Sequence, residues 1–434
     1  MSALAASSRP VRELAQELSQ SRRSAADLVA ASLRRIEETQ PTINAFVEVD
    51  LNAPDSAAAA DRALAGKAAS GLLTGIPYAV KDIIAVAGTR MRAGSDAYDE
   101  ASADDAEAVR RLRAAGAVIL GRTRLHEIAF GASGLNGSDG GARNPRDLAR
   151  VPGGSSSGSA AAIAAGICNV ALGTDTGGSC RIPAACCGVV GYKPSYGLLP
   201  LGGVMPLAPT LDHLGVLASG VDDAWIATAI MLGREPSPLA RRFPRRAGVL
   251  VESRVEEDEI VSDALDAALA RLSREGCEVV KVELPWSGDV PRLAARIMFR
   301  EAYRVHADRL TSRGKSFGAD VRSRLDEGSR ITDDDYQRAL AERERLAGKV
   351  SELFAHVDVL ISPTVPIVPP LITEAASRGA LLPRNTRLFN VIGAPAISLP
   401  LPGFPLPVGL QVAGRAGTDD DLFAFAQAIE ALLA

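Results

Sequence analysis

Segments with the pattern of short buried strands alternate with helical patterns along most of this chain of 434 residues. Strand-like apolar runs occur at 117–120, 170–172, 247–251, 278–284, 358–362, 396–399 and 408–412. Helical patterns lie at 10–20, 24–39, 104–115, 159–167, 182–188, 263–274 and 333–354, with a last one from about 420. This alternation is typical of an α/β protein and predicts a mixed β-sheet covered by helices on both sides.

The domain organisation is inferred from how the sequence patterns change along the chain. No convincing linker divides it, so we expect one domain over residues 1–434. Helical patterns dominate between 235 and 355, and we interpret this stretch as a helical subdomain.

Charge and aromatic content exclude some function classes. The chain has 48 Lys and Arg against 52 Asp and Glu, a net charge of −4, which argues against a strongly basic nucleic-acid binder. Aromatic residues make up only 4%, which argues against a stacking platform for single-stranded nucleic acid.

Cellular location is inferred from segments that the sequence lacks. The first ten residues do not resemble a secretory signal, and the longest apolar run, 160–168, is shorter than the ~18 residues that a membrane helix needs. The five cysteines form no CxxC pair, a pattern that fits buried reduced thiols. We therefore expect a cytoplasmic protein without a membrane partner.

Two turns rich in glycine and serine, 153–159 and 173–181, flank one short Ala-rich helix and one strand. Successive backbone N–H groups in such a turn can surround a developing negative charge, as acyl transfer requires. Ser179 follows Gly177 and Gly178 in the second turn, where it would be well placed as a nucleophile.

A nucleophilic serine needs a base. The four histidines are not accompanied by an obvious GxSxG motif and acidic partner, so a serine–histidine–acid triad is poorly supported. Lys81 is the alternative, because it lies in the otherwise apolar stretch 75–84. A buried lysine loses its proton near neutral pH and can then act as a base.

These motifs resemble the amidase signature family, the Ser–cis-Ser–Lys amidohydrolases. The two serines at 155 and 179 lie 24 residues apart, and Lys81 lies 74 residues before the first of them. The similar segments are 44–46, the surroundings of Lys81, 121–127, 153–191, 211–215, 384–390 and 406–411. The resemblance implies a twisted mixed sheet flanked by helices on both sides, and a variable region at 235–355 that shapes the substrate pocket.

The resemblance also implies a role for each motif residue. Ser179 is the nucleophile, Lys81 the base and Ser155 the bridging serine, behind a cis peptide bond that follows Gly154. The oxyanion hole is made by the backbone N–H groups of Thr176, Gly177, Gly178 and Ser179. No metal or organic cofactor is implied.

Neighbouring polar residues have supporting roles in this interpretation. Ser157 and Thr174 are expected to be hydrogen-bond partners of the catalytic residues. Asp175 and Arg181 are expected to pair with each other, although Arg181 could instead bind a substrate carboxylate. We expect His213 to be a structural histidine.

A second group of cations lies in the variable region. Arg292, Arg296 and Arg300 recur every four residues on one expected helix face. The simplest interpretation is that this helix face is exposed to solvent. The alternative is that it lines the substrate pocket with positive charge and favours anionic substrates.

We expect hydrolysis of a small linear carboxamide to a carboxylate and ammonia or an amine. The segment 203–212 looks more like stand-alone amidases than the alternative, the glutaminase subunit of a tRNA-dependent amidotransferase. We also consider a hydrolase of urea derivatives, such as biuret or allophanate, and a non-catalytic binder on the same fold. A homodimer is the self-assembly that we consider.

Overall fold

A computed structural model describes residues 9–66, 71–138 and 140–434. Its strands are β1 (Phe46–Val49), β2 (Pro77–Lys81), β3 (Arg90–Met91), β4 (Glu100–Ala101), β5 (Val118–Thr123), β6 (Val170–Thr174), β7 (Val190–Lys193), β8 (Leu214–Ala218), β9 (Arg246–Leu250), β10 (Glu278–Val282), β11 (Val359–Pro363), β12 (Ala396–Leu401) and β13 (Val408–Ala413).

The α-helices are α1 (Val11–Ser19), α2 (Ala25–Ile43), α3 (Ala53–Ala65), α4 (Glu107–Ala114), α5 (Ser157–Ala164), α6 (Arg181–Cys187), α7 (Val221–Met231), α8 (Glu259–Arg274), α9 (Val290–Arg313), α10 (Ala319–Arg330), α11 (Asp333–Leu353), α12 (Ala375–Arg378), α13 (Arg387–Val391) and α14 (Asp419–Leu433). None of the helices in the described ranges is both long and apolar enough to cross a membrane.

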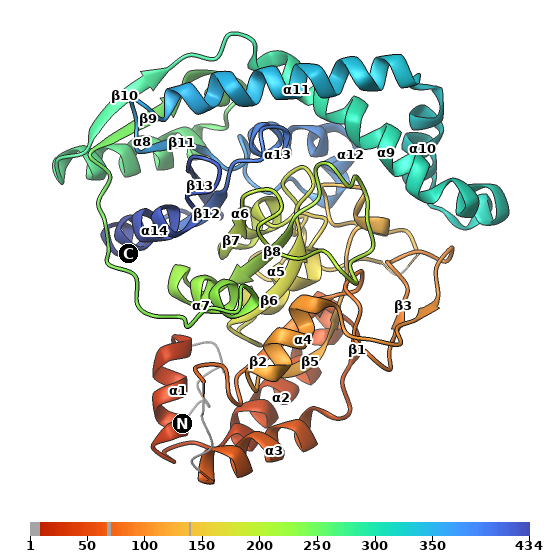
Figure 1. The fold of residues 1–434 in the computed structure, drawn as a ribbon, viewed down its shortest axis with the longest axis vertical. Helices are drawn as coiled ribbons and strands as arrows, with labels where there is room; N and C mark the ends of the chain where they lie inside the picture. The colour runs from red at the N-terminus through yellow and green to blue at the C-terminus, as the bar shows by residue number, and fades with distance from the viewer. Residues whose placement is uncertain (1–8, 67–70, 139) are drawn as a thin grey trace.

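One mixed sheet of eleven strands forms the centre, in the order β1-β5-β2-β6-β8-β7-β12-β13-β11-β9-β10 (Figure 1). The β5–β2–β6 and β11–β9–β10 groups are parallel, and the strands between them are antiparallel. The central strands β2, β6, β7 and β8 are buried at every position. Helices therefore cover both faces of the sheet, as predicted, and this burial explains why these strands are apolar rather than alternating.

The parallel pair β2 and β6 positions the candidate site. Val80 lies opposite Leu172, so the two strands end beside one another, at Lys81 and at Thr174. The carboxyl ends of neighbouring parallel strands are where α/β proteins commonly bind ligands. The second glycine-rich turn begins at the end of β6, and α6 follows it.

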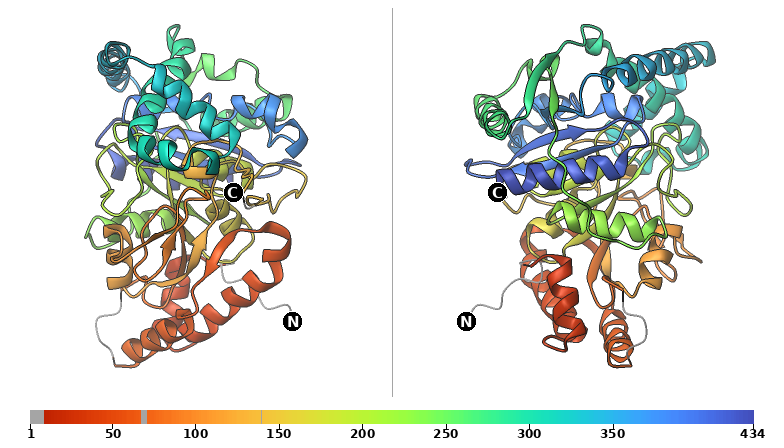
Figure 2. Two further views of the ribbon diagram at one scale, coloured as in Figure 1. Left: turned by 90° about the vertical axis from the view of Figure 1, so that its right-hand side faces the viewer. Right: turned by 60° about the vertical axis from the view of Figure 1, so that its left-hand side comes forward.

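The segment 235–355 contributes both helices and strands. β9 pairs in parallel with β11 and so extends the main sheet. The helices α9, α10 and α11 pack against one another at the top of the molecule, apart from the N-terminal helices at the bottom (Figures 1 and 2). The first and the last part of this segment thus differ in architecture.

Some element boundaries differ from the sequence expectations. The helix expected at 24–39 continues as α2 to Ile43, with Pro41 in its last turn, and ends at Asn44 in the left-handed conformation (φ 49°). Proline is tolerated there because the helix stops within three residues, and asparagine adopts positive φ more readily than most residues. The sequence patterns did not indicate α3, β1, β7 or β8.

Candidate active site

Lys81 ends β2 with no exposed surface. Its Nζ atom lies 2.7 Å from Ser155 Oγ, 2.8 Å from Thr174 Oγ1 and 3.0 Å from Ser156 Oγ. Burial lowers the pKa of Lys81 to about 7, although nearby Cys180, Asp175 and Asp212 oppose the shift. A large fraction of this lysine is therefore neutral near pH 7 and can accept a proton.

A cis peptide bond joins Gly154 to Ser155. Ser155 is fully buried, and its carbonyl oxygen accepts a hydrogen bond from the backbone N–H of His126 at 3.1 Å. The next residue, Ser156, donates its backbone N–H to the carbonyl oxygen of Ser179 at 3.2 Å. This backbone bond brings the two glycine- and serine-rich turns together beside Lys81.

Ser179 lines a pocket of about 850 Å³ and is 9% exposed. Thr176 and Gly177, from the same turn, also line the pocket. The rest of the wall includes Met298 and Phe299 from α9 and residues of the 129–137 loop. A hydroxyl in the wall of a largely apolar pocket, near a buried lysine, suits a nucleophile.

The four expected oxyanion donors are not all available. The Gly178 N–H donates to Asp175 Oδ1 at 2.8 Å, so in this structure it does not face a substrate oxygen. The N–H groups of Thr176, Gly177 and Ser179 make no hydrogen bond within the described ranges. Gly178 has φ +125°, and a Cβ there would lie 2.2 Å from Thr386 Oγ1, so this position requires glycine.

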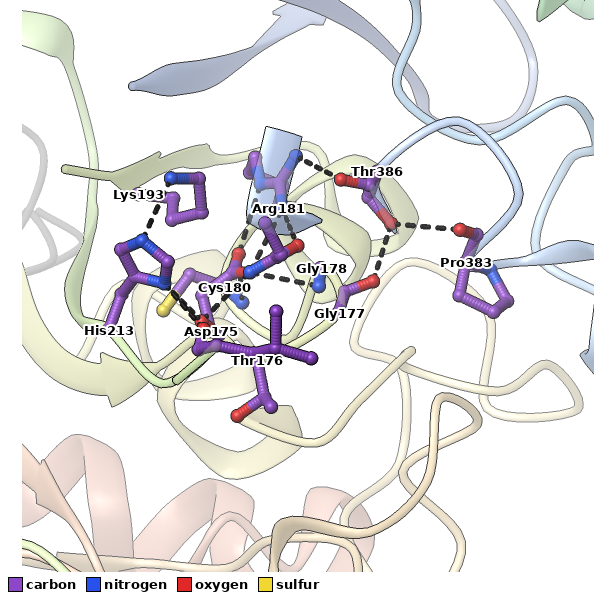
Figure 3. Close-up of polar contacts among 12 residues, drawn as sticks. Asp175, Thr176, Gly177, Gly178, Cys180, Arg181, Lys193, His213, Pro383 and Thr386 are labelled. Atoms are coloured by element: carbon purple, nitrogen blue, oxygen red, sulfur yellow. Dashed lines mark hydrogen bonds and ion pairs between the residues drawn. The ribbon is translucent and has the colours of Figure 1, made fainter. Parts of the chain in front are cut away.

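Asp175 and Arg181 form the expected buried pair, with Nη2 2.9 Å from Oδ1 and Nε 3.0 Å from Oδ2 (Figure 3). Arg181 also donates to the carbonyl of Thr386, to Gln411 and to Asn390. Burial alone would raise the pKa of Asp175, but Arg181 holds it well below its usual range. With all these contacts filled, Arg181 is a structural cation and is not directed at a substrate.

Asp175 also orders the turn that carries Ser179. Its carboxylate accepts the backbone N–H groups of Gly178 and, at 3.1 Å, of Cys180. Beside the same turn, Thr386 donates its hydroxyl to the Gly177 carbonyl at 2.7 Å (Figure 3). Residues on both sides of Ser179 are therefore fixed by side chains.

His213 is buried among hydrogen-bond partners, as expected. Its Nδ1 atom lies 2.7 Å from the Leu211 carbonyl oxygen and its Nε2 atom 3.3 Å from Lys193 Nζ. Burial and the nearby Lys193 lower its pKa well below the usual value, so it is a neutral structural residue.

One of the hydroxyls beside Lys81 belongs to a residue that was not expected from the sequence. Thr174 contacts Lys81 as expected, but Ser157 Oγ is buried without a hydrogen-bond partner in the described part of the chain. Ser157 begins α5, and its Cβ packs near Gly134. Ser156, which precedes the helix, makes the contact that was expected of Ser157.

We predict that Ser156→Ala lowers the pKa of Lys81 by about one unit, because it removes an acceptor that stabilises the charged amine. The acid limb of the pH–rate profile for kcat/KM should then move to lower pH by the same amount. Ser159→Ala removes a nearby hydroxyl that bonds Thr123 and the Leu172 carbonyl instead, and provides the matched control. A limb that stays in place in the Ser156 variant would contradict the prediction.

The arginine face in α9 does not line the pocket. Arg292 is exposed and pairs with Asp289 at 2.8 Å, and Arg300 pairs with Asp333 at 2.6 Å. This finding corrects the alternative of a positive lining formed by Arg292, Arg296 and Arg300, because surface carboxylates occupy two of them and the helix turns another face to the pocket.

A buried lysine, two serine turns and N–H groups beside one pocket are the groups that an acyl-transfer hydrolase requires. Comparison with known proteins gives the family. The Amidase family profile matches residues 27–423, so the chain belongs to the amidase family. It is an amidohydrolase that acts on the C–N bond of amides.

Individual relatives cover nearly the whole chain. A subunit of glutamyl-tRNA(Gln) amidotransferase from Koribacter versatilis is 35% identical, with 96% of each chain covered. A crystal structure of an amidase is 36% identical with a TM-score of 0.93, covering 98% of this chain and all of that one. The structure of the same amidotransferase subunit from Thermotoga maritima is 32% identical with a TM-score of 0.82, covering 99% of this chain and 96% of that one.

These relatives bear on the choice between a stand-alone amidase and a glutaminase subunit. The Koribacter protein and the Thermotoga structure are both amidotransferase subunits. They support the glutaminase subunit better than the stand-alone amidase that the segment 203–212 indicated.

Proposed function

We propose that Ser179 attacks the amide carbonyl while Lys81 acts as the base through Ser155. The observation that carries this proposal is the buried Lys81 Nζ, 2.7 Å from Ser155 Oγ, next to Ser156, whose backbone N–H bonds the carbonyl oxygen of Ser179. A neutral amine has two N–H donors and one lone pair. Ser156 and Thr174 accept the two N–H bonds, which leaves the lone pair for the Ser155 hydroxyl.

The reaction then follows in two halves. Ser179 passes its proton to Ser155 as Ser155 passes its own to Lys81, and the Ser179 oxygen bonds to the carbonyl carbon. The backbone N–H groups of Thr176, Gly177 and Ser179 stabilise the resulting oxyanion. The proton returns to the departing nitrogen as the C–N bond breaks, and water then hydrolyses the acyl-enzyme by the same route.

Glutamine is the substrate that the amidotransferase relatives support, and this chain would then be the glutaminase subunit of a tRNA-dependent amidotransferase. Partner subunits would receive the ammonia, and the complex would work in the cytoplasm. The competing function is a stand-alone amidase that acts on a small amide as a monomer or homodimer. It is supported by the amidase structure with a TM-score of 0.93.

The experiment measures ammonia and acid release from glutamine, aliphatic and aryl amides, malonamate and biuret, with and without co-expressed partner subunits. Turnover of glutamine only with partners supports the glutaminase subunit. Turnover of other amides by the chain alone supports the stand-alone amidase, and biuret turnover supports a urea-derivative hydrolase. No turnover, together with no labelling of Ser179 by a phosphonylating probe, would overturn the catalytic proposal in favour of a binder.

The pKa of Lys81 gives a pH prediction. Only the neutral amine accepts a proton, so kcat/KM should fall tenfold per pH unit below a pH of about 7 and level off above it. Lys81→Met should remove this acid limb together with most of the activity. A wild-type profile that is flat from mildly acidic to mildly alkaline pH, on a substrate without ionisable groups, would contradict the role of Lys81.

A further inference from the structure

Arg387, the first residue of α13, lines the pocket that contains Ser179. It also adjoins the turn before the nucleophile, because a Cβ on Gly177 would lie 3.8 Å from Arg387 Cγ. The C-terminal part of the chain thus places the aliphatic part of the Arg387 side chain beside the turn that carries the oxyanion donors.

The Arg387 side chain makes no hydrogen bond or ion pair with any described residue, and its Nε atom is buried without a partner. Two other arginines near this site, Arg324 and Arg181, do have protein partners. Arg324 lies 3.4 Å from Asp320 and donates to the Phe130 carbonyl, and Arg181 has five bonds. Arg387 is part-buried, and its Nε atom is shielded from water without an acceptor, an arrangement that is rare unless a ligand completes it.

The charged groups of the pocket wall favour an anion. Arg143, Arg324 and Arg387 contribute positive charge, and Asp320 contributes the negative charge. Asp320 already contacts both Arg324 and His126. Burial and the neighbouring Arg324 lower the pKa of Arg387 to about 10, so it still carries its charge at neutral pH.

We propose that Arg387 binds a carboxylate on the acyl part of the substrate. This inference rests on the proposed function: if ammonia is the leaving group, a substrate carboxylate must lie on the acyl side. A planar guanidinium binds a carboxylate through two parallel hydrogen bonds, which also orients it. The substrate class is then the monoamides of dicarboxylic acids, with glutamine as the member that also carries an ammonium group.

The test compares kcat/KM for three primary amides of equal chain length, glutaramate, pentanamide and glutamine, with partner subunits present if turnover requires them. Wild type should prefer glutaramate to pentanamide by about 10- to 100-fold. Arg387→Met should reduce that ratio to near one, and Arg387→Lys should restore part of it. Arg292→Met removes an exposed arginine and should keep the wild-type ratio.

A binding measurement separates recognition from catalysis and from misfolding. In a Ser179→Ala background, glutarate should raise the Tm of the chain with Arg387 and leave the Tm of Arg387→Met unchanged. The ligand-free Tm of Arg387→Met should not fall, because the side chain has no protein partner to lose among the described residues.

The outcomes decide between the role of Arg387 and the catalytic proposal. Equal kcat/KM for pentanamide and glutaramate, or a glutarate-induced Tm shift that survives in Arg387→Met, would overturn the role of Arg387 while the catalytic proposal stands. No turnover and no Ser179 labelling, with the Tm shift present and dependent on Arg387, would overturn the catalytic proposal alone. Preference for glutamine over glutaramate would show that the ammonium group is recognised as well, and the reverse would show that it is not. Loss of the preference of both over pentanamide in Arg387→Met supports the role of Arg387 in either case.

Discussion

Ser179→Ala is expected to lower kcat for amide hydrolysis by about 10⁴-fold or more, a loss of the size seen when a serine hydrolase loses its nucleophile. Without the hydroxyl no acyl-enzyme forms, and the pocket retains only binding and its N–H groups. Because Ser179 donates no side-chain hydrogen bond to a described residue, the variant should fold as the wild type does.

The measurement is steady-state release of ammonia with product identification by mass, alongside the circular dichroism spectrum and Tm of each protein. Ser377→Ala, an exposed serine whose hydroxyl bonds only the nearby Glu374 carbonyl, is the matched control and should retain wild-type kcat. Residual activity within about tenfold of wild type in Ser179→Ala would show that another group is the nucleophile.

Arg181→Met is expected to lower the free energy of unfolding by about 3–5 kcal/mol at pH 7. The substitution leaves the Asp175 carboxylate buried without its cation and removes donors from Thr386, Asn390 and Gln411. Asp175 has its pKa held below the unfolded value, so its stabilising contribution is present above about pH 4 and is lost as the pH falls through its folded pKa. The difference between wild type and variant should therefore shrink in acid.

Urea unfolding followed by circular dichroism, at neutral pH and in acid below about pH 4, measures this effect. Arg345→Met, which breaks an exposed pair with Glu342, should change the unfolding free energy by less than ~1 kcal/mol. The double variant Asp175→Asn with Arg181→Met should be more stable than Arg181→Met alone, because no unpaired charge is then buried. An unchanged urea midpoint in Arg181→Met would mean that the Asp175–Arg181 pair contributes little to the free energy of unfolding.

The sequence predicts the α/β class and the position of the two glycine-rich turns, because apolar runs and glycine clusters are local signals. It does not predict that Ser156, and not Ser157, contacts Lys81. Ser155, Ser156 and Ser157 are adjacent and alike, and their directions depend on the backbone where α5 begins. The spacing of the motifs therefore locates the site, but it does not assign a contact to each serine.

The role proposed for Arg387 is likewise hidden in the sequence. It lies in the family-like segment 384–390, but the pocket that it lines is assembled from several separate stretches of chain. The hydrogen bond of the Gly178 N–H is also not predictable from the sequence. Its N–H is taken by Asp175, three residues earlier, and nothing in the glycine pattern indicates that contact.

The ends of β2 and β6, where Lys81 and Thr174 lie side by side, place all the proposed chemistry in residues 81–179. Met298, Arg324 and Arg387, which line the pocket, come from the part of the chain after 290. Part of the pocket wall is therefore encoded after the proposed catalytic residues, while the 129–137 loop supplies another part from within their region. Recombining the region after 290 between homologues would be an efficient way to change the amide that is hydrolysed while keeping the catalytic residues intact.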